Sequence, residues 1–362
     1  VADFLGKDMF SAVSTDEHPV KDLTVKELLD AAAAAIPVRF ADAPEIAAKV
    51  YEALGSAYES LEYLLDAGSS LERALALYRA PDIDDIHGSA RVAAGLVRLK
   101  YPVGQLPALI QGYQQIHEQA AARLGSTDPR VIHLRGSLAQ GRIQLGEFEA
   151  GAQELAALLE IARKSGDQPT QLTTQSALSY VLIELGRTSE AEVLLTELLR
   201  LQATAKGEDH RDIGLSKLRL ARIHYESGRL DSAELLLNEA DAIAARWDVP
   251  NSGLPLNVRL YRAWLRYQQR RYREAVDILI AIKAEVASED AAAFNQSYTE
   301  DRPLGLAYRA LGMSKEAKAA LTAGYQSAMQ SLGAQHPWTL QLGRDLAAAS
   351  QSEPPRATAS IP

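Results

Sequence analysis

Residue types that could perform catalysis or bind a metal are few in this sequence and lie far apart. The seven histidines are scattered, and His117-Glu118 is followed at the fourth position by Ala121, where a His-Glu-x-x-His zinc site needs a second histidine. The acidic residues at 82–85 lack the glycine and distal glutamate of a calcium loop. No phosphate-binding loop, nucleophile elbow or kinase signature is present. The sequence therefore predicts no enzyme, no metal site and no bound cofactor.

Tyrosine, tryptophan and arginine offer a different chemistry, the recognition of a ligand or partner. These types dominate binding energy when they are desolvated at an interface, and an arginine beside an aromatic ring can bind a carboxylate. The candidate ligand-binding residues, which fall on one face of successive repeats, are Arg98, Tyr101, Tyr180, Arg222, Tyr225, Trp264, Tyr267 and Arg302. Six further residues fall on the same face: Arg91, His133, Gln140, Glu184, Gln268 and Arg309. The alternative is that the rings pack between helices and that Arg222 pairs with Glu226 on its own helix.

A motif that recurs at near-constant spacing must position these residues. It is clearest at residues 185–191, which read Leu-Gly-Arg-Thr-Ser-Glu-Ala. The last position of each copy follows the previous one by 42, 42, 40, 42, 42 and 42 residues, at Ala67, Leu109, Gly151, Ala191, Ala233, Ala275 and Ala317. In most copies a leucine and a small residue lie upstream, and a large apolar residue lies four positions downstream. This pattern predicts a pair of closely packed helices in each unit, with glycine ending the first helix in a left-handed cap.

The paired motif resembles the tetratricopeptide repeat. Residues 54–58 (Leu-Gly-Ser-Ala-Tyr) and 304–308 (Leu-Gly-Leu-Ala-Tyr) match one half of it, and the Ala-x-x-x-large half follows in six of seven units. The interval exceeds the usual ~34 residues, and residues 332–340 are similar to a Leu-Gly-x-x-His-Pro-x-Thr-Leu loop of the long, kinesin-light-chain variety. HEAT and armadillo repeats have a compatible period but lack the paired motif. The resemblance implies an all-α, right-handed superhelical solenoid of about seven hairpins, with the first helices lining a concave groove.

The repeats divide the sequence into four predicted segments. These are an N-terminal helical extension over 1–46, the solenoid over 47–333, a C-terminal capping helix over 334–349 and a disordered tail over 350–362. Thr24 and Glu27 form a capping box that starts a helix in the extension. Pro37 is expected to stop that helix, and Pro44 to start the next.

The N-terminal extension also resembles a juncture just outside the membrane in two groups of bacterial receptors. The likeness rests on residues 22–30 (Asp-Leu-Thr-Val-Lys-Glu-Leu-Leu-Asp) and 39–45 (Arg-Phe-Ala-Asp-Ala-Pro-Glu). One group comprises membrane-anchored winged-helix transcription regulators, and the other comprises membrane-bound serine/threonine kinases with tetratricopeptide sensor regions. The resemblance implies that this chain is the extracytoplasmic sensor, with the membrane tether and effector domain outside it. Val1 in place of Met indicates a fragment.

Composition excludes some partners. The net charge of −9 and the pI near 5.4 argue against direct nucleic-acid contact, which needs clustered Lys and Arg. The sequence has no cysteine, which excludes disulfides and thiolate chemistry. It also has no apolar run close to the ~20 residues that span a bilayer, and no signal peptide.

Two functional hypotheses remain after catalysis is set aside. The first is a sensor of a bacterial transmembrane transcription regulator, on the periplasmic side of the inner membrane, which binds a peptide, protein or small effector in its groove and signals through a homodimer. The second is a cytoplasmic adaptor or peptide receptor built from the same repeat. Neither hypothesis is favoured by a motif within the repeats themselves.

Overall fold

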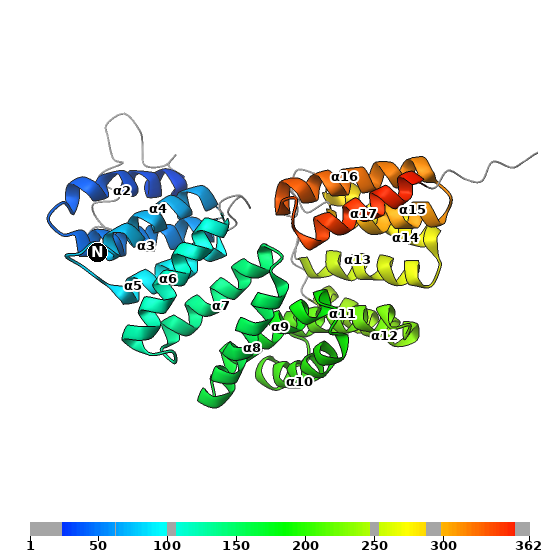
Figure 1. Ribbon diagram of the computed structural model, residues 1–362, viewed down its shortest axis with the longest axis horizontal. Helices are drawn as coiled ribbons and strands as arrows, with labels where there is room; N and C mark the ends of the chain where they lie inside the picture. Colours follow the sequence, from blue (N-terminus) through cyan, green and yellow to red (C-terminus); the bar gives the residue numbers. More distant parts are fainter. Residues whose placement is uncertain (1–23, 62, 100–105, 247–252, 287–297, 352–362) are drawn as a thin grey trace, which may run out of the picture. The chain divides into compact units, whose positions relative to one another are not determined.

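The computed structural model describes residues 24–61, 63–99, 106–246, 253–286 and 298–351. Within these ranges the chain forms α-helices joined by turns, and no strand (Figure 1). The helices α2 to α7 are Val25–Arg39, Pro44–Ser60, Leu64–Tyr78, Ile86–Arg98, Leu106–Leu124 and Pro129–Gln144. The helices α8 to α17 are Phe148–Ser165, Gln168–Glu184, Thr188–Lys206, Arg211–Glu226, Leu230–Arg246, Gly253–Gln268, Tyr272–Val286, Tyr298–Ala310, Ser314–Leu332 and Pro337–Gln351. The seven predicted repeats coincide with the successive pairs from α3–α4 to α15–α16, which confirms the all-α, repeat-built fold class.

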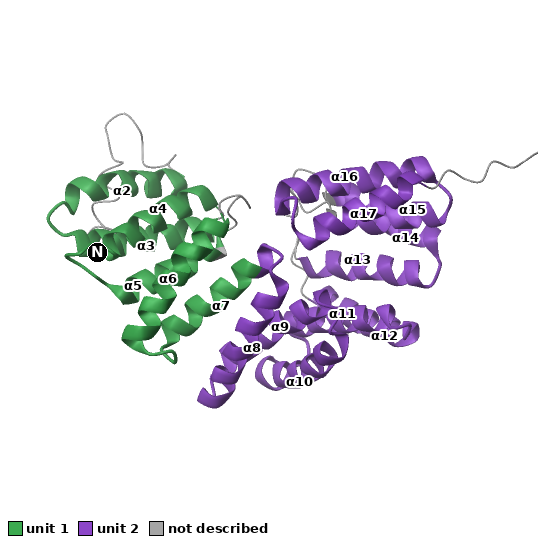
Figure 2. Ribbon diagram, in the orientation of Figure 1, with its two compact units in different colours: residues 1–142 green, residues 143–362 purple. Residues whose placement is uncertain are grey.

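The helices gather into two compact units (Figure 2). Unit 1 comprises residues 1–142 and unit 2 comprises residues 143–362, so the boundary falls within the third repeat. The predicted division into extension, solenoid, cap and tail stays a prediction. Of the predicted tail, Ser350 and Gln351 belong to α17, and residues 352–362 lie outside the described residues.

The small residue of the repeat motif lies where the two helices of a pair approach each other most closely. A Cβ added at Gly55 would come within 2.6 Å of Leu71, and one added at Gly305 would come within 2.5 Å of Leu321. In both pairs the leucine stands sixteen positions after the glycine, and the motif alanine in the first turn of the second helix is fully buried. Because a larger side chain would separate the helices, the spacing of small and large residues fixes the geometry of each pair.

The turns between the paired helices of unit 2 repeat the left-handed cap that the motif predicts. Gly186, Gly228 and Gly312 have φ values of +72°, +80° and +76°. The equivalent position in the sixth repeat is Arg270, which adopts φ of +61° although it has a side chain. That repeat therefore carries a backbone cost that its neighbours avoid.

The first described helix begins as expected and ends later than expected. Thr24 accepts a hydrogen bond from the backbone N–H of Glu27, and the Glu27 side chain accepts one from the backbone N–H of Thr24, so the capping box is confirmed. Pro44 stands at the start of α3, as predicted. The expectation that Pro37 stops α2 is wrong, because the helix continues to Arg39. Pro37 lies in the last turn, where its ring removes only one backbone hydrogen bond.

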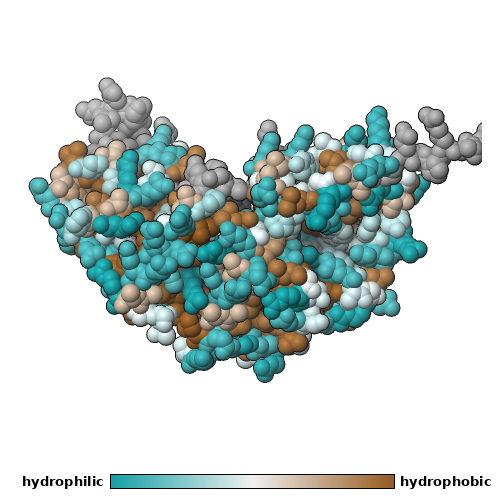
Figure 3. Space-filling model, viewed as in Figure 1, coloured by the Kyte–Doolittle hydropathy of each residue, from teal (hydrophilic) through white to brown (hydrophobic). Residues whose placement is uncertain are grey.

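Polar and apolar residues are interspersed on the face of the molecule seen in Figure 3. Several large apolar side chains are exposed, with Leu65 at 88%, Val38 at 85% and Val193 at 72%. Scattered exposed apolar residues are normal on a folded protein. In the part of the chain that the structure describes, no helix combines the length and the apolar character needed to cross a bilayer.

We predict that Arg270→Gly raises the free energy of unfolding by about 1 kcal/mol, because glycine adopts positive φ without a steric cost. The reciprocal change Gly312→Arg should lower it by a similar amount. Urea denaturation followed by circular dichroism measures both. Equal stability of Arg270→Gly and the parent would show that the turn stores no strain.

Candidate ligand-binding groove

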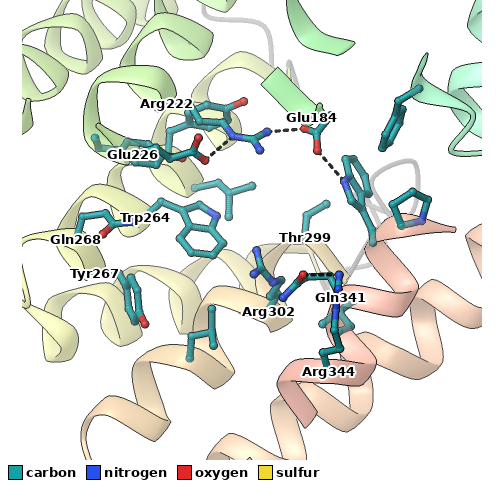
Figure 4. A pocket seen from close by; sticks show the side chains of 18 residues that line it. Glu184, Arg222, Glu226, Trp264, Tyr267, Gln268, Thr299, Arg302, Gln341 and Arg344 are labelled. Carbon is teal, nitrogen blue, oxygen red and sulfur yellow. Dashed lines mark hydrogen bonds and ion pairs between the residues drawn. The ribbon is translucent and has the colours of Figure 1, made fainter. Parts of the chain in front are cut away.

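A cavity of about 640 Å³ opens in unit 2 (Figure 4). Apart from Phe148, its lining comes from α9, α11, α13, α15 and α17, which are the first helices of successive pairs together with the last helix. The lining residues are Phe148, Glu184, Arg222, Tyr225, Glu226, Leu260, Tyr261, Trp264, Tyr267, Gln268, Thr299, Arg302, Leu306, Pro337, Trp338, Gln341, Leu342 and Arg344. The first helices therefore present a groove, and its volume falls within the range typical of ligand sites.

Five of the eight sequence-predicted residues meet at this cavity: Arg222, Tyr225, Trp264, Tyr267 and Arg302. Tyr180 is not part of the lining, and its ring lies 5.9 Å from the guanidinium of Arg219. Arg98 belongs to α5 of unit 1, and its side chain lies outside the described residues, as does Tyr101 as a whole. Whether the eight residues bind a ligand stays a prediction.

The rings of α13 form the middle of the cavity. Trp264 and Tyr267 are three residues apart and pack edge to face, with centroids 6.0 Å apart. Both are partly buried, and each also contacts apolar core residues, so they present one surface to the core and another to the cavity. Tyr225 is only 4% exposed and packs against Tyr261 at 6.5 Å, so packing is its main role.

The wall made by α9 and α11 carries two carboxylates and one guanidinium. Nη1 of Arg222 donates to Glu184 at 2.5 Å, and its Nε donates to Glu226 at 2.9 Å. Burial is the largest single influence and lowers the pKa of Arg222, but the charges of Glu184, Tyr225, Tyr261 and Glu226 together outweigh burial and raise the pKa overall. The predicted pairing of Arg222 with Glu226 is therefore present, and a second carboxylate shares the same guanidinium. A ligand carboxylate would have to compete with both.

The two ends of unit 2 meet through a contact that we name the clasp, formed by Gly146, Phe148 and Glu184 with residues 336–338. The indole Nε1 of Trp338 donates to Glu184 at 2.9 Å, across 154 residues of sequence. The ring of His336 packs edge to face against Phe148 at 5.8 Å. A Cβ at Gly146 would come within 2.3 Å of the proline that follows His336. Unit 2 thus curves until α17 contacts α9 and the turn before α8.

The clasp holds a histidine in its neutral form. His336 is 4% exposed, and burial lowers its pKa against the smaller opposing effect of Glu184. Its Nδ1 accepts a hydrogen bond from the backbone N–H of Trp338 at 3.2 Å, which requires that this nitrogen carry no proton. Protonation of His336 therefore removes an acceptor and places a charge among aromatic rings.

The wall made by α15 and α17 carries the opposite charge. Nε of Arg302 donates to Asp345 at 2.7 Å, and Gln341 donates to the other oxygen of that carboxylate at 3.1 Å. The guanidinium of Arg302 lies 5.5 Å from the ring centroid of Trp264. Arg344 is exposed and donates to Gln341 at 2.8 Å. Two guanidiniums thus stand beside a single carboxylate on this wall.

Several lining residues were not predicted from the sequence, and α17 contributes more of them than any other helix. Trp338, Gln341 and Arg344 belong to the predicted C-terminal capping helix over 334–349. One signal could have found Arg344: it stands 42 positions after Arg302, at the next step of the repeat interval. The contact of Trp338 with Glu184 depends on how far the helix pairs curve, and the sequence pattern does not specify that.

No protein-family model and no curated protein matches this chain. Several solved structures are similar to it. A tetratricopeptide repeat protein from Parabacteroides merdae is 15% identical, with a TM-score of 0.56, covering 84% of this chain and 98% of that one. A Rap protein complexed with Competence and Sporulation Factor is 13% identical, with a TM-score of 0.50, covering 90% of this chain and 80% of that one.

A third similar structure is a signal transduction ATPase with numerous domains from Pyrococcus horikoshii, which has a tetratricopeptide repeat sensor. It is 15% identical, with a TM-score of 0.53, covering 91% of this chain and 50% of that one. At these identities the likeness concerns the fold. The chain has a tetratricopeptide-repeat-like solenoid fold.

We predict that the free energy of unfolding of unit 2 falls in mild acid, because His336 of the clasp becomes protonated. The unfolded chain has a histidine pKa of about 6.5, whereas the pKa of His336 in the folded chain is lower. The unfolded state therefore binds the proton first, and stability falls as the pH falls through 6.5 towards the folded pKa. Urea denaturation at pH 7.5 and pH 5.5 should show a larger loss for the parent than for His336→Gln.

The comparison between these two proteins isolates His336. Burial also lowers the pKa values of His117 and His224, but both residues are present in the parent and in the variant. An equal loss of stability in the two proteins would contradict a role for His336.

Proposed function

We propose that unit 2 binds a peptide or an extended protein segment in the groove formed by α9, α11, α13, α15 and α17. The observation that supports this most strongly is the cavity itself, in which side chains from five stacked helices converge. Aligned helices at equal spacing form an extended concave surface, and such surfaces bind extended or helical peptides. A compact small molecule would use only part of that length.

The chemistry of the lining supports the same proposal. The rings of Trp264 and Tyr267 offer accessible aromatic surface, and polar groups surround them on both walls. Aromatic and arginine side chains supply most of the energy at protein interfaces. The aromatic surface would hold an apolar side chain, and the walls would fix the direction of the bound chain.

Two of the similar structures are consistent with recognition as the task of this fold. The Rap protein is in complex with Competence and Sporulation Factor, and the ATPase carries its repeats as a sensor. These likenesses concern the fold, so they support the proposal only as analogy. No catalytic role is proposed.

We further propose that this binding serves signalling, with the chain as the sensor of a bacterial transmembrane regulator on the periplasmic side of the inner membrane. The support is the resemblance of residues 22–30 and 39–45 to such receptors. Ligand binding would then act on an effector domain through a homodimer. The alternative is a cytoplasmic adaptor, which would use the same groove but would have no membrane tether.

The gene sequence upstream of Val1 separates the sensor from the adaptor. A winged-helix or kinase domain followed by an apolar span of about 20 residues supports the sensor. A reading frame that starts close to Val1 without such a span rejects it, and leaves the binding groove as proposed.

We predict that Trp264→Ala combined with Tyr267→Ala weakens peptide binding by at least tenfold, since both rings leave the middle of the groove. Peptides selected from a random display library on the parent protein provide the ligands, and fluorescence anisotropy measures their affinity. Helical circular dichroism should persist in the variant.

The matched control is Val193→Ala combined with Leu235→Ala, which removes two exposed apolar side chains from the second helices α10 and α12. This control should bind as the parent does. If the α13 variant loses its fold and its binding together, the rings are packing residues. If the folded α13 variant binds as well as the control does, the groove is not the binding site.

A further inference from the structure

The charged groups of the cavity are separated across Trp264. Figure 4 shows Glu184, Arg222 and Glu226 on one side of the indole, and Arg302, Gln341 and Arg344 on the other. The first side carries two carboxylates and one guanidinium, and both carboxylates pair with that guanidinium. The second side carries two guanidiniums, and Asp345 pairs with only one of them. A ligand in the cavity therefore meets a wall with unmatched positive charge at α15 and α17.

Arg302 is held in place and keeps part of its hydrogen-bonding capacity. Its Nε pairs with Asp345, and its guanidinium lies over Trp264 at 5.5 Å. The side chain is 34% exposed. Because Nε is used, the two terminal nitrogens are the groups that can donate to a ligand, and the contact with the indole helps to hold the guanidinium in place.

Arg344 supplies the unmatched charge. It is exposed, and its contact within the described ranges is the donation from Nη2 to the amide oxygen of Gln341 at 2.8 Å. Gln341 in turn donates to Asp345. This chain of contacts orients Arg344 beside Arg302 without neutralising it.

We propose that Arg302 and Arg344, oriented by Gln341, form an anion subsite that binds a carboxylate of the bound peptide. This inference rests on the proposed function and specifies its ligand. A carboxylate fits better than a phosphate, because the wall has one unmatched positive charge and a phosphate monoester carries nearly two negative charges at neutral pH. The planar carboxylate also matches the fork geometry of a guanidinium.

The position of the subsite defines the rest of the ligand. Trp264 lies directly beside Arg302, and Leu260 and Leu306 complete an apolar surface in the same cavity. A peptide whose carboxylate reaches Arg302 and Arg344 therefore places its neighbouring residue on this surface. The ligand class is a peptide with an acidic group next to a large apolar residue.

An array of hexapeptides tests this proposal. Each sequence carries one large apolar residue and is made in three versions, with Asp, Asn or Lys next to it, and with an amidated C-terminus. A fourth version has Asn and a free C-terminal carboxylate, which distinguishes a side-chain source from a terminal source. We expect carboxylate versions to bind the parent about tenfold more tightly than their amide counterparts, which is about 1.4 kcal/mol.

In Arg344→Ala this ratio should fall towards one, while binding of the Asn versions is retained. The control is Arg309→Ala, which removes the same charge from α15. Arg309 falls on the predicted face, but in the structure it is exposed and is not part of the cavity lining. It should keep the ratio. High salt should reduce the ratio in the parent, since a partly exposed ion pair is screened.

The outcomes separate the two proposals. Equal binding of Asp and Asn versions by the parent, or a ratio that survives in Arg344→Ala, overturns the subsite and leaves the groove as a peptide site. A ratio lost equally in Arg309→Ala also overturns it, because net charge alone would then be responsible. If the parent binds no version at all, the peptide-binding function fails together with the subsite.

Discussion

The close contact between a small residue and a leucine sixteen positions later is the constraint on which this fold depends. At Gly55 and Gly305 no larger side chain fits against the facing helix. The contact holds the two helices of a pair close together but leaves their outer apolar faces uncovered. Each pair must therefore stack on the next, and stacking aligns the first helices side by side. The groove is a direct result of that alignment, because the exposed faces of the first helices become its lining.

Closure of unit 2 turns this aligned surface into a cavity. Glu184 has a double role, since one oxygen accepts from Arg222 in the groove and the other accepts from Trp338 in the clasp. Its side chain is 7% exposed, so both partners help to offset the cost of burying the charge. The same residue thus links the interior of the groove to the contact that closes it. On the opposite wall, no carboxylate of the described residues pairs with the second guanidinium, which gives the cavity a polarity along which a peptide can be oriented.

Much of the fold could be predicted from the sequence, because the contacts that define it are local. Spacing of leucine, glycine and alanine depends only on the geometry within one helix pair, and the capping box at Thr24 depends on residues three apart. Positions on the first helices followed from the same register, and five of the eight candidate residues line one cavity. The sequence pattern is incomplete at Arg270. This residue keeps the positive φ of the helix cap, although it stands where the other repeats of unit 2 have glycine.

The remaining features depend on contacts between distant residues. The partners of Arg222 come from its own helix and from α9, and only the first was evident from the sequence. The clasp requires a specific curvature summed over several repeats, and small differences between repeats determine that sum. For this reason α17 was predicted as a cap rather than as part of the lining. The deep burial of Tyr225 likewise depends on its packing against Tyr261, a residue of the next repeat.

The distance between two spin labels on unit 2 tests the central claim, that its ends meet and enclose the groove. The sequence has no cysteine, so cysteines introduced at the exposed positions Gln153 of α8 and Leu340 of α17 label two sites uniquely. Pulsed electron paramagnetic resonance should give a single narrow distance that agrees with the structure. A broad distribution, or one centred at a much longer distance, would mean that the clasp is open and that the cavity does not exist in solution.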